Sequence, residues 1–159
     1  SAVQPINGYN FGAQNYDRVR KTYRLATGIA LVISALWWLV YLLLPRQLAA
    51  LFVSNEPLYL DCAAHCFRLY MAAFFLYGVH MTTASFFQGI GKPACSLLIP
   101  LVRQGLLLIP LALLLSRWQG LDGALYAVPI ADAATCLLCI IMASLEFRRW
   151  KKRGWLPAG

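Results

Sequence analysis

Two charged residues lie inside long apolar stretches of this chain, where a charge needs a specific reason. Arg103 lies within the apolar stretch 94–116, and Asp132 lies within the stretch 121–145. At the centre of a membrane-spanning helix, each such charge costs about 2.5–3.5 kcal/mol of insertion free energy. Charges at that depth pair with each other, line substrate pathways or relay protons. The two residues are therefore the first candidates for substrate or ion binding, and the alternative is a structural ion pair that fixes helix packing.

Three further polar side chains are weaker candidates for substrate or ion binding. His80 lies deep in the apolar stretch 69–90 and could exchange protons near neutral pH, or be a satisfied histidine between packed helices. Gln88 and Gln104 carry amides, which more often bond helix to helix than bind a ligand. The chain shows no nucleophile–base set, no phosphate-binding glycine loop and no cluster of metal-ligand spacing. We therefore predict no enzyme activity, no catalytic or metal-binding residue and no cofactor.

Four apolar stretches must position these side chains, and they cover 25–44, 69–90, 94–116 and 121–145. Each reaches the length of about 20 residues that a helix needs to cross the hydrocarbon core. Composition agrees, because 60% of the residues are hydrophobic and 13% are charged. A spanning segment must pair its own backbone amides, which favours helices. We predict an all-α, polytopic transmembrane helix bundle with four complete spans in a lipid bilayer, and we exclude a water-soluble domain.

The formal net charge of +8 is unevenly distributed along the chain. Basic residues precede the first apolar stretch and follow the last one, in a basic tail at 146–159. The connectors at 45–68 and 117–120 together hold three basic residues. By the positive-inside rule, both ends of the chain lie in the cytoplasm, as in a multi-pass protein of the cell membrane. Nucleic acid is not an expected partner, since the basic residues cluster at the membrane borders and not on a face shared with aromatic side chains.

Local signals predict the connections between these stretches. Residues 7–13 hold two glycines and two asparagines, which is typical of a turn, and residues 14–24 should form a short surface helix. Pro57 marks a helix start, from which one helix could run unbroken to residue 90. The glycines and proline of 89–93 should end it and create an antiparallel hairpin. Prolines inside the later stretches should bend their helices; these are Pro100, Pro110 and Pro129.

Several motifs, in order along the chain, resemble the C-terminal lobe of multidrug and toxic compound extrusion (MATE) transporters. They are QPINGYNFGA at 4–13, FFQGIGKP at 86–93, RQ at 103–104 followed by Pro110, GLDGA at 120–124 and PIAD at 129–132. The resemblance implies a fold of twelve helices in two six-helix lobes. Residues 1–159 would then be a partial C-terminal lobe, with the end of helix eight and helices nine to twelve. We also expect the chain to be the C-terminal part of a longer protein, because it opens on an apolar segment.

The resemblance further implies a secondary active antiporter that exports organic cations or amphipathic drugs in exchange for H⁺ or Na⁺. Transport would proceed by alternating access, with the N-terminal lobe of the same protein as the second wall of the cavity. The coupling ion is not assigned by the residues present. Two alternatives stay open: a flippase of related fold for lipid-linked oligosaccharides, and a four-helix membrane scaffold subunit that transports nothing.

Overall fold

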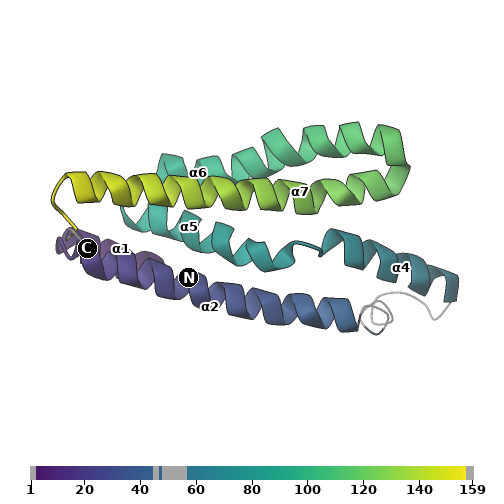
Figure 1. Ribbon diagram of the computed structural model, residues 1–159, viewed down its shortest axis with the longest axis horizontal. Helices are drawn as coiled ribbons and strands as arrows, with labels where there is room; N and C mark the ends of the chain where they lie inside the picture. Colours follow the sequence, from purple (N-terminus) through teal and green to yellow (C-terminus); the bar gives the residue numbers. More distant parts are fainter. Residues whose placement is uncertain (1–2, 45–46, 48–56, 157–159) are drawn as a thin grey trace.

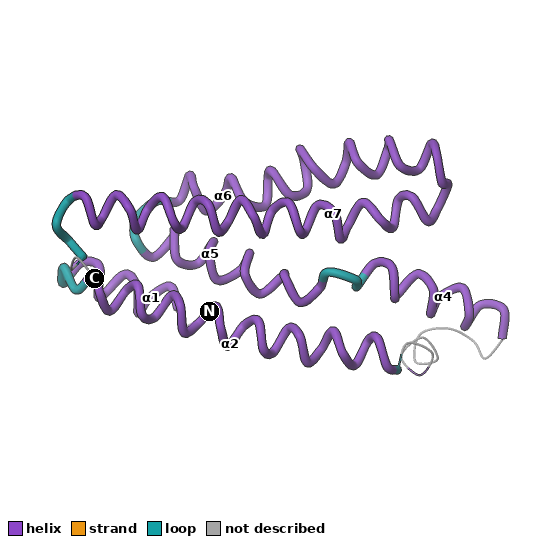
Figure 2. The backbone as a smooth tube through the Cα atoms, in the orientation of Figure 1, coloured by secondary structure: helices purple, strands orange, loops and turns teal. Residues whose placement is uncertain are grey.

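The computed structural model describes residues 3–44, 47 and 57–156, and these residues form an elongated bundle of helices (Figure 1). The elements in chain order are α1 (Val3–Gly12), α2 (Tyr16–Leu43), α4 (Pro57–Tyr70), the 3₁₀ turn η1 (Phe74–Leu76), α5 (Tyr77–Gly89), α6 (Pro93–Leu101), the π-helix η2 (Val102–Leu108) and α7 (Ile109–Lys152). The described ranges contain no strand, and most connections lie at the ends of the bundle (Figure 2). The all-α prediction is confirmed.

The bundle has the polarity expected of a protein dissolved in lipid. None of the residues in the most apolar window of α2 is buried. Large aliphatic side chains such as Leu36 and Leu113 have 59% and 63% of their surface exposed. Polar side chains, by contrast, are buried inside; they are Asn7, His80, Thr82, Thr83, Ser96, Asp132, Thr135 and Glu146. Water would reverse this distribution, so the apolar outer surface is a membrane-facing surface.

Within the described ranges, two helical stretches are each long and apolar enough to cross a membrane, Tyr16–Leu43 and Pro93–Lys152. A third candidate is the bent pair Asp61–Tyr70 and Phe74–Gly89. The longest stretch holds 60 residues, but its backbone leaves the helical region at Gly120, with φ 62° and ψ −135°. Figure 1 shows that it consists of two legs that run back alongside each other. The predicted spans 94–116 and 121–145 fall on these two legs, and the total of four spans stays a prediction.

The turn predicted at 7–13 is wrong, because α1 continues through Gly12 and the chain turns afterwards, with Gln14 at φ 61°. Close packing explains the small residues of this segment. A Cβ atom added to Gly89 would lie 2.9 Å from the Cβ atom of Asn7, so α1 and α5 approach through small residues. The surface helix predicted at 14–24 exists, although it begins at Tyr16 and is continuous with the first span in α2.

The unbroken helix predicted from Pro57 to residue 90 is also wrong. α4 ends at Tyr70, α5 begins at Tyr77, and the two halves meet at 40°. The bend packs against α2, because the ring of Phe75 lies 5.6 Å from that of Trp38. Residues 70–76 contain neither proline nor glycine, so the sequence carries none of the usual signals for a break. The break shortens the helical part of the predicted span 69–90. The hairpin predicted at 89–93 is confirmed, since α5 ends at Gly89 and α6 begins at Pro93.

The first half of the basic tail predicted at 146–159 is helical, because α7 extends to Lys152. Glu146 fixes this end of α7 to the turn between α5 and α6: its Oε1 accepts hydrogen bonds from Lys92 Nζ at 2.6 Å and Trp150 Nε1 at 2.9 Å. Beyond α7 the chain folds back, and the Trp155 ring stacks on Tyr16 at a centroid distance of 4.4 Å. The end of the bundle with the concentrated basic residues is therefore a well-packed part of the fold.

The approach of α5 to α2 depends on Gly78, and Gly78→Ala should destabilise the protein. A Cβ atom at this position would lie 2.8 Å from the carbonyl oxygen of Ala30 and 2.9 Å from the Ser34 hydroxyl. Overpacking of this kind costs about 1–3 kcal/mol. Gly28→Ala is the matched control, because a Cβ atom there meets nothing within 4 Å. In thermal unfolding in detergent, Gly78→Ala should melt below the wild type and Gly28→Ala should not. Equal melting temperatures for the two variants would contradict this packing.

Candidate ion and substrate site

Arg103 of η2 and Asp132 of α7 form an ion pair in the interior of the bundle. Arg103 Nε donates a hydrogen bond to Asp132 Oδ1 at 2.6 Å. Only 17% of the Arg103 side chain and 5% of the Asp132 side chain are exposed. At a rise of 1.5 Å per residue, Asp132 lies about 18 Å along α7 from the reversal at Gly120. The two charges are in direct contact, and this contact fits both a functional and a structural interpretation.

His80 of α5 joins this pair through the backbone. Its Nε2 lies 3.1 Å from the carbonyl oxygen of Asp132. Since a carbonyl oxygen only accepts hydrogen bonds, Nε2 is the donor, and Nδ1 of the neutral ring is then an acceptor. Nδ1 is buried and has no hydrogen-bond partner among the described residues. The histidine is thus satisfied at one nitrogen only, and the other can accept a proton or a hydrogen bond.

Tyr77 lies one helical turn before His80, and its ring contacts both Arg103 and His80. The guanidinium carbon of Arg103 lies 5.7 Å from the centroid of the Tyr77 ring, within the range of a cation–π contact. The same ring lies 6.2 Å from that of His80, edge to face. Tyr77 was not among the candidates predicted from the sequence. Its signal was the spacing of three residues from a deep histidine, which places both on one helical face.

A cavity of about 130 Å³ opens beside these groups. Its lining residues are Tyr77, His80, Met81, Ala84, Ile99, Pro100, Arg103 and Gln104. A mostly apolar wall with a few polar groups is typical of sites for organic molecules. The volume corresponds to about four water molecules at roughly 30 Å³ each, so on its own it would hold only part of a drug-sized ligand.

The backbone around Arg103 departs from the α-helix. Residues Val102–Leu108 form a π-helix, which ends where the Ile109 amide donates to the carbonyl oxygen of Gln104. Such segments are rare and are frequent at functional sites. Pro100 lies just before it and Pro110 just after it, and each removes a backbone donor. Bends at these prolines were predicted from the sequence, whereas the π-helix between them was not.

Four of the five predicted candidates meet at this place. Arg103, Asp132 and His80 are in contact, and Gln104 lines the cavity. Gln88 does not line the cavity; it is exposed near the end of α5, about 12 Å along the helix from His80. The structure therefore separates Gln88 from the other candidates.

Comparison with known proteins identifies the family of this chain. The MatE family model matches residues 1–114. The FAD transporter of Shewanella oneidensis is 29% identical over 143 residues, which cover 90% of this chain and 31% of that protein. The multidrug export protein MepA of Staphylococcus haemolyticus is 26% identical, with coverage of 92% of this chain and 32% of the relative. The chain thus spans about a third of the length of the curated relatives that it matches.

Solved structures share the fold. The MATE multidrug transporter DinF-BH matches with a TM-score of 0.82 and 33% identity, over 89% of this chain and 31% of that chain. The inward-facing conformation of a MATE family transporter of the MOP superfamily matches with a TM-score of 0.88 and 21% identity, over 95% of this chain and 35% of that one. Because the family model covers most of the chain and these transporters have the same arrangement of helices, the chain belongs to the MatE family.

Proposed function

We propose that residues 1–159 form part of the C-terminal lobe of a secondary active antiporter in the cell membrane, with both ends of the chain in the cytoplasm. The whole protein exports organic cations or amphipathic drugs in exchange for an inward-moving ion, by alternating access between two lobes. The observation that carries the proposal is the buried Arg103–Asp132 pair, which contacts His80 beside a cavity inside an apolar helix bundle. Within a MatE family chain, charges in this position are expected to serve transport.

The geometry favours H⁺ over Na⁺ as the coupling ion. His80 has a buried acceptor nitrogen without a hydrogen-bond partner among the described residues, and its Nε2 donates to the backbone carbonyl oxygen of Asp132. Imidazoles and carboxylates are common proton-transfer groups in proteins. A Na⁺ site would need several oxygen ligands, whereas Asp132 Oδ1 and the Asp132 carbonyl oxygen already accept hydrogen bonds from Arg103 and His80. Protonation of Asp132 would leave Arg103 without a counter-charge in the interior, which costs about 3–5 kcal/mol for a buried pair. A proton can therefore drive a rearrangement between η2 and α7.

Export of organic cations fits this site better than export of a dinucleotide such as FAD. One relative is an FAD transporter and another a multidrug export protein, so both substrate classes must be weighed. FAD carries two negatively charged phosphates, which bind to free cationic groups. Arg103 is the one permanently cationic side chain among the described residues that line the cavity, and its charge is neutralised by Asp132. The aromatic and apolar wall suits a cationic or amphipathic ring system.

Efflux from cells that express the full-length protein tests the function. Such cells should expel a fluorescent organic cation faster than cells without the protein, and collapse of the proton gradient should abolish the difference. Collapse of a sodium gradient at constant pH should leave efflux unchanged. Sodium-dependent efflux would contradict H⁺ coupling alone, whereas FAD export without export of the cation would contradict the substrate class.

Neutralisation of Asp132 should impair transport. Asp132→Asn keeps the size of the side chain and removes the charge that pairs with Arg103, so we expect efflux to fall at least tenfold at normal expression. Asp122→Asn is the matched control on the same helix. The Asp122 carboxylate contacts His65 Nε2 at 3.2 Å, and both side chains are about half exposed. Wild-type efflux by Asp132→Asn would remove Asp132 from the mechanism.

A double substitution separates the functional role of the pair from the structural one. Arg103→Ala leaves a buried carboxylate without a partner. This should destabilise the fold by about 3–5 kcal/mol and so lower the amount of folded protein. Adding Asp132→Asn removes the orphan charge and should restore part of that amount. If the pair serves transport, the double variant stays inactive even where folded protein recovers, as measured by fluorescence-detected size-exclusion chromatography. Recovery of efflux together with folding would show that the pair is structural only.

A further inference from the structure

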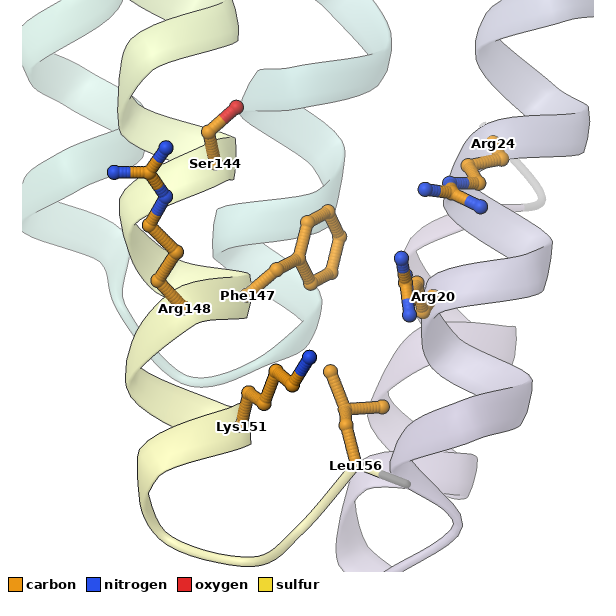
Figure 3. Close-up of a pocket in the computed structure, with 7 residues that line it drawn as sticks. All are labelled: Arg20, Arg24, Ser144, Phe147, Arg148, Lys151 and Leu156. Carbon is orange, nitrogen blue, oxygen red and sulfur yellow. The ribbon is translucent and has the colours of Figure 1, made fainter. Parts of the chain in front are cut away.

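A pocket lined by basic side chains lies at the end of the bundle where α2 begins and α7 ends (Figure 3). Its volume is about 250 Å³, and its lining residues are Arg20, Arg24, Ser144, Phe147, Arg148, Lys151 and Leu156. Figure 3 shows the guanidinium groups of Arg20 and Arg24 on α2 and the amine of Lys151 on α7 directed toward the space between the two helices. The described lining contains four basic residues and no acidic one, so we call it the basic pocket.

Two described carboxylates near the lining residues in the sequence are engaged by other partners. Asp17 pairs with Lys21 at 2.7 Å, and the buried Glu146 accepts hydrogen bonds from Lys92 and Trp150. Arg20 Nε is buried and has no hydrogen-bond partner among the described residues. A buried donor without an acceptor is unfavourable, and more so when the group is charged. An anion in the basic pocket would supply the missing acceptor.

A second cavity continues from the basic pocket along α2 and α7. Its volume is about 420 Å³, and it shares Arg24, Ser144 and Phe147 with the basic pocket. The remaining wall of this apolar groove is formed mainly by hydrocarbon and small side chains, including Leu31 and Ile140. A free phosphate ion would make no favourable contact with this apolar groove. A phospholipid would, because its phosphate is joined to an acyl chain that can pack there.

We propose that the basic pocket binds the phosphate of an anionic phospholipid, and that one of its acyl chains lies in the apolar groove. The guanidinium groups of Arg20 and Arg24 present paired donors that match phosphate oxygens. Basic pockets between membrane helices at the cytoplasmic side are suited to lipid head groups. The bound lipid fills the space between α2 and α7, and so holds the two helices together.

Binding to the purified full-length protein in detergent tests this assignment. Native mass spectrometry and thermal unfolding would compare phosphatidylglycerol, phosphatidylcholine with the same acyl chains, and inorganic phosphate at constant ionic strength. The wild type should retain phosphatidylglycerol and melt at a higher temperature with it, while the other two ligands should have little effect. The double variant Arg20→Gln/Arg24→Gln should bind phosphatidylglycerol at least tenfold more weakly.

Two matched variants keep the test decisive. Arg18→Gln/Lys152→Gln removes the same charge from positions of α2 and α7 outside the basic pocket, and should bind phosphatidylglycerol like the wild type. Gly28→Leu places a bulky side chain in the apolar groove, and should weaken phosphatidylglycerol binding even if the arginine variant does not fold.

Three results would overturn the proposal. An equal loss of phosphatidylglycerol binding in Arg20→Gln/Arg24→Gln and in Arg18→Gln/Lys152→Gln would mean a diffuse charge effect. Protection by inorganic phosphate as strong as by phosphatidylglycerol would mean a free-anion site. Failure of the wild type to retain phosphatidylglycerol would mean that another part of the protein, or nothing, occupies the basic pocket.

Discussion

The absence of water from the bilayer core is the constraint on which the rest of this structure depends. A polar group that faces hydrocarbon has no solvent partner, so it must find one inside the protein. This is why Asp132 is buried while leucines cover the outer surface. It also explains the nature of its partner, because Asp132 bonds the opposite charge of Arg103 on a neighbouring helix.

The same constraint decides what could be predicted from the sequence. The length and apolarity of the stretches predict helices, because a helix is the arrangement in which a single segment pairs its own backbone amides in lipid. Arg103 and Asp132 were found as partners because two charges in adjacent antiparallel stretches are costly apart and compensate each other when paired. The hairpin at 89–93 was also predicted, because glycine allows the backbone angles of a tight turn and proline cannot continue a preceding helix.

Features that depend on packing between distant segments were not predictable in this way. Gly8 was interpreted as a turn residue, whereas it lies inside α1. Gly89 ends α5 as predicted, and it also allows α1 and α5 to approach. Nothing in residues 70–76 indicates the break between α4 and α5. Gln88 shares a helix with His80 and still lies outside the site, because the helical register and the position of η2, not sequence proximity, decide which side chains meet.

The location of the ion pair has a mechanical consequence. α7 is fixed at its basic end by Glu146, which bonds Lys92 and Trp150, and the helix is regular there. On the other side of the pair, Arg103 belongs to a π-helix flanked by Pro100 and Pro110, where backbone hydrogen bonding is least regular. A change in the charge of Asp132 therefore acts at the contact of α7 with η2. Because α7 is held by Glu146 at its basic end, we expect η2 to take up more of the movement. In the proposed antiporter, η2 and the cavity wall beside it are then the part of this lobe that responds to the ion.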